Sequence, residues 1–325
     1  MIDLTTSYAG LKLKTPVIVS SSGLTNTVVR IKKMASAGAG AVVLKSLFEE
    51  QILHEISTFS AASDYPGAED YIRTYARENS LDTYLNLIKS AKESVDIPVI
   101  ASINCVSSRE WVTFASEIEK AGADALELNI YFLAANKDRN PRDYEKNYLD
   151  LVSEVRKRTG LPVMVKLGAG FTNIPWIVDQ LALLGASAVV LFNRFYAPDI
   201  DTETLAFGSS EVLSSPQDIR DSLRWVGIVS SQVKNIDIAA STGVHSGLAV
   251  VKQILAGASA VQVCSVLYRN GVDYLRDMIG EMKKWMEKRR VNSLAEFRGR
   301  LNYGKLKDPS VYERSQFIKY FSRMT

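Results

Sequence analysis

A short apolar phrase recurs four times along the chain and sets its hydrophobic pattern. Residues 37–44 read AGAGAVVL, 121–128 read AGADALEL, 184–191 read LGASAVVL and 256–263 read AGASAVQV. In each copy, a glycine follows a segment of helical period and precedes a continuous apolar run. Glycine just past a helix supplies the left-handed cap, and a continuous apolar run is typical of a buried parallel strand. The repeat therefore predicts a chain built from βα units.

The same pattern, followed over the whole chain, predicts eight strands that alternate with eight helices. The strands are expected at residues 17–21, 41–45, 99–105, 125–129, 163–167, 188–192, 236–241 and 260–264. The helices are expected at residues 28–37, 81–94, 111–121, 143–158, 176–184, 218–233, 249–255 and 274–290. This alternation predicts an α/β fold of the (β/α)8 TIM barrel type.

Several segments lie outside this alternation. Residues 2–13 are expected to form a short hairpin that closes the barrel floor. The connections 54–78 and 196–216 follow the second and sixth strands, so both are expected to be long loops over the top face, where lids and binding loops occur. A helical tail with several aromatic residues is expected to pack on the outer helices. We predict a single domain over 1–325, of which 293–325 is a C-terminal extension.

The composition is that of a globular protein without a strong charge bias. Hydrophobic residues make up 46% and charged residues 23% of the 325 residues, and the formal net charge is +3. This balance gives no electrostatic reason to expect a nucleic acid or a membrane as partner. No apolar stretch is long enough to span a bilayer, and the N-terminus lacks a signal-peptide pattern. The two cysteines, Cys105 and Cys264, both fall in predicted strands, so we expect no disulfide framework and a cytoplasmic location.

Polar residues follow the predicted strands, at the end of a barrel that carries its chemistry. They are Ser21, Ser22 and Gly23, Lys45 and Ser46, Asn104, Asn129, Lys166, Asn193 and Arg194, Ser241, Thr242 and Gly243, and Cys264 and Ser265. Carboxylates are nearly absent from this ring, and the chain has only two histidines, His54 and His245. Because divalent metals prefer carboxylates, or Cys and His in the case of zinc, we expect no metal site.

The sequence offers more of the groups that a phosphate site needs than of those that a metal site needs. In such barrels, the loops after the seventh and eighth strands commonly bind phosphate. Here the backbone N–H groups of Gly243 and Ser265, with the hydroxyls of Thr242 and Ser265, are expected to hold an oxyanion. The alternative is that Ser and Thr are only helix N-caps, where they are preferred anyway.

Two lysines, Lys45 and Lys166, each follow an apolar run. An ammonium group facing the interior is costly unless it pairs with an anion or an electron-rich ligand. Lys166 is suited to stabilise negative charge developing on a ring system. The alternative is a salt bridge to an acidic residue such as Glu127 inside the barrel. Because asparagines rather than acids occupy most neighbouring strand ends, we favour a functional role for both lysines.

The strand-end motifs resemble a known family. VIASINC at 99–105 and AGADALELN at 121–129 are similar to the FMN barrels of dihydroorotate dehydrogenases and to the pyrimidine-reducing domain of dihydropyrimidine dehydrogenase. VQVCS at 261–265 matches the phosphate motif of the last strand in that family, and STGV at 241–244 matches its usual TGGI. Lys45 and Lys166 match its two flavin-facing lysines, and the likeness runs in order from residue 4 to residue 297.

The resemblance implies an FMN across the top of the barrel and a homodimer. It implies a hydride transfer from a dihydropyrimidine acid, as in the oxidation of dihydroorotate to orotate in pyrimidine biosynthesis, in which Lys45, Asn129 and Asn193 take part. Lys45, Asn129, Asn193 and Arg194 are the substrate-binding candidates. The candidates for FMN binding are Ser21, Ser22, Lys45, Ser46, Asn104, Asn129, Lys166, Thr242, Gly243, Cys264 and Ser265.

The substrate half departs from the family. Where the family has a Cys or Ser general base, this chain has Phe132, which accepts no proton. Arg194 replaces a usual Ser or Thr, and residues 64–71 and 213–216 lack the family's lid and Gly-Gly motifs. Tyr131 beside that position and Cys105 are alternative bases, although packing roles are favoured for both.

Two other functions remain open at this point. One is a flavin-binding barrel that acts on a different substrate or without dehydrogenase turnover. The other is a flavin-free, phosphate-binding lyase or isomerase, which fits the phosphate loops but not the two lysines and the asparagines. The chain has no iron–sulfur cysteine cluster and no dinucleotide fingerprint, so the sequence does not indicate the electron acceptor.

Overall fold

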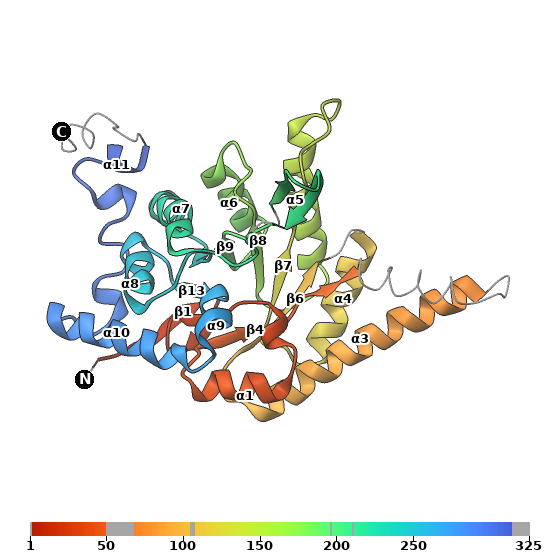
Figure 1. The fold of residues 1–325 in the computed structure, drawn as a ribbon, viewed down its shortest axis with the longest axis horizontal. Coiled ribbons are helices and arrows are strands. Elements are labelled where there is room, and N and C mark those ends of the chain that lie inside the picture. Colours follow the sequence, from red (N-terminus) through yellow and green to blue (C-terminus); the bar gives the residue numbers. More distant parts are fainter. Residues whose placement is uncertain (1, 50–67, 105–107, 196, 210, 314–325) are drawn as a thin grey trace.

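A computed structural model describes residues 2–49, 68–104, 108–195, 197–209 and 211–313. Eight parallel strands close into a barrel, which confirms the predicted TIM fold (Figure 1). They are β3 (Val17–Val19), β4 (Ala41–Val43), β6 (Val99–Asn104), β7 (Ala125–Asn129), β8 (Val163–Leu167), β9 (Ala188–Leu191), β12 (Asp237–Ala240) and β13 (Ala260–Val263). Each pairs with the next, and β13 pairs with β3 to close the ring. A short strand β5 (Leu47–Phe48) adds to the upper end of β6.

Helices surround this barrel at the eight predicted places, and the short helix α9 after the last strand is additional. They are α1 (Val28–Ser36), α3 (Ala68–Ser94), α4 (Ser108–Lys120), α5 (Pro141–Arg156), α6 (Ile174–Leu183), α7 (Ile219–Gln232), α8 (Gly247–Ala256), α9 (Ser265–Asn270) and α10 (Tyr274–Arg289). The glycine of each repeated phrase has a positive φ, between 87° and 126°. The four helix ends therefore lie where the glycines of the repeat led us to expect them. No helix in the described ranges is long and apolar enough to cross a bilayer.

The N-terminal hairpin closes the barrel floor, as predicted. Strands β1 (Thr6–Tyr8) and β2 (Leu11–Leu13) pair antiparallel around Ala9 and Gly10, whose φ angles of 52° and 79° suit a tight primed turn. The side chains of Tyr8 and Leu13 are fully buried in the lower barrel interior. The Ala9 N–H donates to Asp237 Oδ2 at 2.8 Å, which ties the turn to the start of β12.

The connection after the second barrel strand differs from the prediction. Helix α3 begins at Ala68 rather than near residue 81, so the second part of the expected loop 54–78 is helical. This first half of α3 is rich in Ala, Glu and Arg, which favour helices. Over its whole length, α3 has only weak amphipathic periodicity, which is the signal by which a sequence pattern detects a helix. His54 and residues 64–67 of the expected lid lie outside the described residues.

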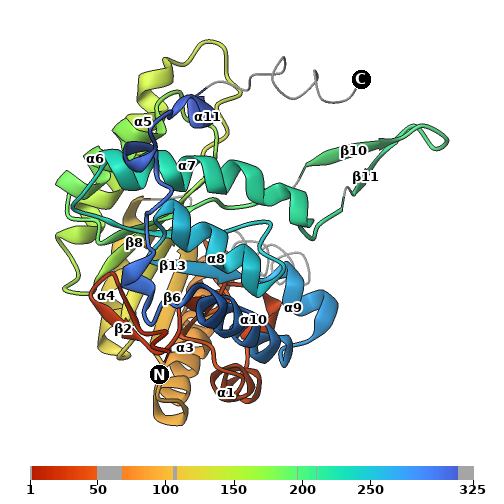
Figure 2. The same cartoon turned by 90° about the vertical axis from the view of Figure 1, so that its left-hand side faces the viewer.

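The connection after the sixth barrel strand is a hairpin rather than an irregular loop. Strands β10 (Pro198–Asp201) and β11 (Ala206–Ser209) pair antiparallel and project from the barrel (Figure 2). Ile200 and Phe207 lie opposite each other in this pair, and both are exposed. Strand pairing across a short turn depends on turn geometry, which the apolar pattern does not report.

The described part of the C-terminal extension packs on the outer helices, as expected for its aromatic residues. It contains two 3-10 turns, η3 (Leu294–Glu296) and η4 (Tyr303–Lys305), and the short helix α11 (Ser310–Glu313). Phe297 is buried beside Trp285, with ring centroids 5.0 Å apart. The ring of Tyr312 lies against Gly227 of α7, where any side chain on the glycine would clash with it.

Two layers of side chains fill the barrel interior, and they differ in polarity. The lower layer is apolar, and at five of its residues a buried polar residue lies two positions further along the chain. The pairs are Ile18 and Ser20, Ile100 and Ser102, Ala125 and Glu127, Met164 and Lys166, and Ala260 and Gln262. Because side chains two apart on a strand share a face, all of these point inward. The barrel therefore carries a buried polar layer directly beneath its upper rim.

Candidate functional site

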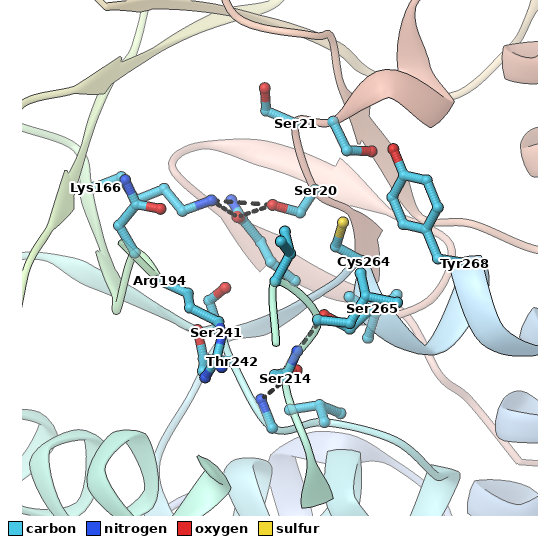
Figure 3. Close-up of a pocket in the computed structure, with 18 residues that line it drawn as sticks. Ser20, Ser21, Lys166, Arg194, Ser214, Ser241, Thr242, Cys264, Ser265 and Tyr268 are labelled. Atoms are coloured by element: carbon cyan, nitrogen blue, oxygen red, sulfur yellow. Dashed lines mark hydrogen bonds between the residues drawn. The ribbon is translucent and has the colours of Figure 1, made fainter. Parts of the chain in front are cut away.

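Two adjoining cavities open at the carboxyl ends of the barrel strands. The first, of about 460 Å³, lies between the loops after β9, β12 and β13, and we call it the β12–β13 cavity (Figure 3). The second, of about 360 Å³, lies over the ends of β4, β6 and β7, and we call it the β4–β7 cavity. Five residues line both cavities, which makes them parts of one groove. They are Ser21, Ser22, Lys166, Asn193 and Arg194.

Ser214 lies between the two predicted phosphate loops and bonds a residue of each. Its N–H donates to Ser265 Oγ at 3.0 Å, and its own Oγ accepts a long bond of 3.4 Å from the Gly243 N–H (Figure 3). His245 Nε2 lies 3.1 Å from the same hydroxyl. Burial, reinforced by the charge of Arg269, lowers the pKa of His245. The segment before helix α7 therefore supplies a polar group to this site although it lacks the expected glycines.

Thr242 and Gly243 have unusual backbone conformations at the end of β12. Both are in the left-handed region, with φ of 74° and 76°. This conformation is strained for a β-branched residue such as threonine. The Thr242 hydroxyl donates to the carbonyl of Phe192 at 3.1 Å, and Thr242 lines the β12–β13 cavity beside Gly243. Gly243 packs directly against the backbone of Ile219, at the start of α7.

Cys264 and Tyr268 line the side of the β12–β13 cavity next to Ser22. Burial raises the pKa of the Cys264 thiol, against the opposing effects of a bond to Ser22 and of the charge on Lys166. The thiol is therefore neutral at physiological pH and is a packing group rather than a nucleophile. The hydroxyl of Tyr268 lies close to Gly23, where an added side chain would meet it.

The β4–β7 cavity brings together most of the residues predicted for the ring and the substrate. Lys45, Ser46, Asn104, Asn129 and Asn193 all line it. The amide of Asn193 donates to Asn129 Oδ1 at 2.6 Å, which fixes the orientation of both side chains.

A chain of hydroxyls supports one wall of this cavity. Ser21 Oγ lies 3.0 Å from Ser46 Oγ, which lies 2.8 Å from the buried Ser102 Oγ. The Tyr84 hydroxyl of α3 bonds both backbone groups of Ser102. Serines from three neighbouring strand ends are thus locked into one network, which holds the rim of the groove rigid.

Lys166 combines the two roles that the sequence left as alternatives. It lines both cavities, and its ammonium donates to Ser20 Oγ at 3.0 Å and to Gln262 Oε1 at 3.1 Å. Nζ also lies 3.7 Å from Oε1 of Glu127, which is fully buried below it. The salt bridge that we considered the less favoured alternative therefore exists, and it does not remove the lysine from the groove.

The side chains of Tyr131 and Phe132 lie in different cavities. Tyr131 lines the β4–β7 cavity and stacks on Phe195, with ring centroids 3.7 Å apart. Phe132 instead packs edge-on against Tyr148 and borders a separate cavity between α4 and α5. The residue at the position of the family's base therefore does not line the groove, and the neighbouring tyrosine does.

Arg194 lines the groove, but its guanidinium is already engaged. It donates to Asp218 Oδ2 at 3.1 Å and to the Glu211 carbonyl at 3.0 Å, and the Glu211 carboxylate pairs with Arg269. These contacts clamp the segment 211–218 across the β12–β13 cavity. Arg194 thus holds this segment in place and at the same time lines both cavities.

The site also contains residues that sequence reasoning missed. Ser20, Gln262, Ser214 and Phe195 all contribute to the groove or to the layer beneath it. A signal existed for Gln262, because a polar residue inside the apolar run 260–263 is unusual. Cys105 lies outside the described residues. Within the described ranges, no group of three or more His, Cys, Asp or Glu side chains is arranged to hold a metal ion.

Comparison with known proteins points to one family. The sequence model of the family described as dihydroorotate dehydrogenase matches residues 3–286. A Thermoplasma acidophilum protein named dihydroorotate dehydrogenase B (NAD(+)), catalytic subunit, is 29% identical over 92% of this chain and 99% of its own length. A Methanocaldococcus jannaschii protein of the same name is 27% identical over 87% of this chain and 94% of its own length. An Aeropyrum pernix protein named putative dihydroorotate dehydrogenase A (fumarate) is 28% identical over 91% and 97%, respectively.

Proposed function

Because this chain belongs to the dihydroorotate dehydrogenase family, a family of oxidoreductases that act on CH–CH bonds, we propose that it is FMN-dependent and oxidises dihydroorotate or a closely related dihydropyrimidine acid. The observation that carries the proposal is that Lys45, Asn129, Lys166 and Asn193 line one cavity. Asparagine amides and ammonium groups suit the amide edges and the carboxylate of such a substrate. In the dihydroorotate case, the product is orotate and the reaction belongs to pyrimidine biosynthesis.

The groove has the donors and the size that a flavin mononucleotide requires. Cavities of about 460 and 360 Å³ that share five residues are within the usual range for cofactor sites. The phosphate would be held near Gly243 and Ser265 with the help of Ser214, and Lys166, Ser21 and Ser46 would contact the ring. When bound, the flavin supplies the acceptor for a hydride from substrate carbon, and the protein positions and tunes it.

Proton removal is assigned to Tyr131 in this proposal. Among the described residues that line the β4–β7 cavity, the titratable side chains are Lys45, Tyr131, Lys166 and Arg194. Lys166 and Arg194 are held by other protein groups, and Lys45 is suited to bind a carboxylate. The orientation of Phe132 away from the groove favours a second candidate, in which flavin is bound but dihydroorotate itself is not turned over.

The visible spectrum of the purified protein is the first test. We expect flavin absorbance near neutral pH, FMN rather than FAD on release, and bleaching on anaerobic addition of dihydroorotate. A Lys166→Ala variant should bind FMN about ten-fold more weakly, since a charge-assisted contact is lost, whereas Lys120→Ala, at an exposed ion pair, should not. A protein that takes up no flavin would refute the proposal. Flavin that dithionite bleaches and dihydroorotate does not would favour the second candidate.

We further propose a single domain over 1–325 that includes the 293–325 extension, a cytoplasmic location and a homodimer. The names of the relatives include NAD(+) and fumarate, so both are acceptors to try. Reoxidation of the dithionite-reduced protein by each compound in stopped-flow mixing identifies which one it uses. Light scattering of the purified protein tests the dimer, and a mass of 35.9 kDa, that of one chain, would refute it.

A further inference from the structure

A fully buried carboxylate lies directly beneath the lysine that lines both cavities. Glu127, on β7, has no exposed surface, and its Oε2 accepts a hydrogen bond from the Gln262 side chain. Its Oε1 has no hydrogen-bond partner among the described residues, and Lys166 Nζ lies 3.7 Å away from it. This oxygen therefore acts on Lys166 by charge and not through a hydrogen bond.

The other partners of Lys166 are neutral. Ser20 and Gln262 accept from its ammonium and orient it, but neither offsets its charge. A buried charge pair interacts strongly because little solvent screens it. The positive charge of Lys166 is thus divided between Glu127 below and whatever binds in the groove above.

We propose that Glu127 is a positioning residue of the flavin site that offsets part of the Lys166 charge and thereby sets the electron affinity of the bound flavin. The inference rests on the proposed function, because it requires that flavin binds over Lys166. Reduction of a flavin adds negative charge to its ring system, and a cation close to the ring favours the reduced form. Removing the Glu127 charge increases the net positive charge that the ring experiences, so it makes the flavin easier to reduce.

The test is a Glu127→Gln substitution read by sulfite titration of the flavin-loaded protein at pH 7. The replacement is isosteric, and the oxygen of the introduced amide can still accept from Gln262, so the orienting contact is kept. Sulfite uses its sulfur lone pair to form a bond to N5 of oxidised flavin, and the ring takes up the negative charge, so sulfite affinity reports the same electrostatics as reduction. We expect about ten-fold tighter sulfite binding, equivalent to about 30 mV for a two-electron couple. Unchanged or weaker binding would overturn the inference.

A matched control separates charge at the site from charge elsewhere. Glu119→Gln removes a carboxylate that bonds Thr159 and Gly160, in the turn before β8 at the opposite end of the barrel. Sulfite affinity should be unchanged in this variant. If it rises as much as in Glu127→Gln, the effect is one of net charge and the inference fails.

A double-mutant cycle shows whether Glu127 acts through Lys166. In a Lys166→Met background, Glu127→Gln should change sulfite affinity by less than about two-fold, because the lysine charge that it offsets is gone. A full ten-fold change in that background would refute the coupling.

Two outcomes remain distinguishable from each other. A native protein that binds no flavin refutes the proposed function, whereas a flavin-loaded protein with unchanged sulfite affinity in Glu127→Gln refutes only this inference. If Glu127→Gln does not fold, Glu127→Asp provides the test. It keeps the charge but withdraws it from Lys166, and should tighten sulfite binding about two-fold. No tightening in the Asp variant would overturn the inference.

Discussion

Gly243→Ala tests whether the end of β12 and the start of α7 must meet as closely as they do beside the groove. A Cβ at Gly243 would lie 2.0 Å from Ile219 N and 2.4 Å from the Asp218 carbonyl carbon. Ordinary contact begins at 3.4 Å, so the two backbones would have to separate by about 1.4 Å. That shift would also strain the contacts of the Asp218 carboxylate with the Ser215 N–H and with Arg194.

The expected cost has three parts. An alanine in the left-handed region loses about 1–2 kcal/mol, overpacking costs about 1–3 kcal/mol, and a weakened hydrogen bond to a charged group costs about 1–2 kcal/mol. We therefore expect Gly243→Ala to lower the free energy of unfolding by about 3–7 kcal/mol, a large part of the total for a protein of this kind. Because Gly243 borders the β12–β13 cavity, flavin retention should fall with it.

Gly122→Ala is the matched control. Gly122 also has a positive φ, 88°, but nothing lies within 4 Å of the added Cβ. It is exposed between α4 and β7, so only the backbone cost of about 1–2 kcal/mol should appear. Urea unfolding followed by circular dichroism gives the two losses from the midpoints and slopes. Equal losses for the two variants would refute the claim that close backbone approach, and not the left-handed conformation alone, requires Gly243.

Three further predictions concern titratable groups that are partly or fully buried. Cys264 in the native protein should react with iodoacetamide at pH 7.5 much more slowly than in urea, since its raised pKa keeps it a thiol; equal peptide labelling by mass spectrometry would contradict this. The pKa of His245 is lowered in the native state, so the unfolded chain binds that proton more readily, and stability should fall as pH drops through about 6.5. His245→Gln should flatten the change in melting temperature between pH 8 and pH 5.5, and an unchanged slope would exclude His245 as its source. Lys166→Met should lower the free energy of unfolding by about 3–5 kcal/mol because Glu127 stays buried without its counter-charge, and adding Glu127→Leu should recover most of the loss in urea titrations.

Most of the fold could be predicted from local sequence signals. Glycines with positive φ, such as Gly38 and Gly185, end their helices where the repeat indicated, and the apolar runs after them are the barrel strands. The glycine caps and the apolar runs each involve only a few neighbouring residues, so both can be recognised in a single sequence. The prediction was wrong for the first half of α3, a helix whose amphipathic periodicity over its whole length is weak.

The arrangement of the candidate site, in contrast, depends on tertiary contacts as well as on local sequence. Residue types at strand ends identified Lys45, Asn129 and Asn193, because a parallel barrel brings all its carboxyl ends to one face. The direction of a side chain beyond the strand is not set by this rule. Phe132 turns outward to Tyr148 while Tyr131 turns in to Phe195, and Arg194 pairs with Asp218 while it lines the groove.

The sequence by itself determined the barrel and the ring of polar residues on its upper rim. Only the tertiary structure decided which of those residues are free to meet a ligand. Lys166 illustrates the difference, because its partners Ser20, Glu127 and Gln262 come from three other strands. Contacts among residues so distant in the chain exist only once the barrel closes, and a pattern that extends over a few neighbouring residues contains no information about them.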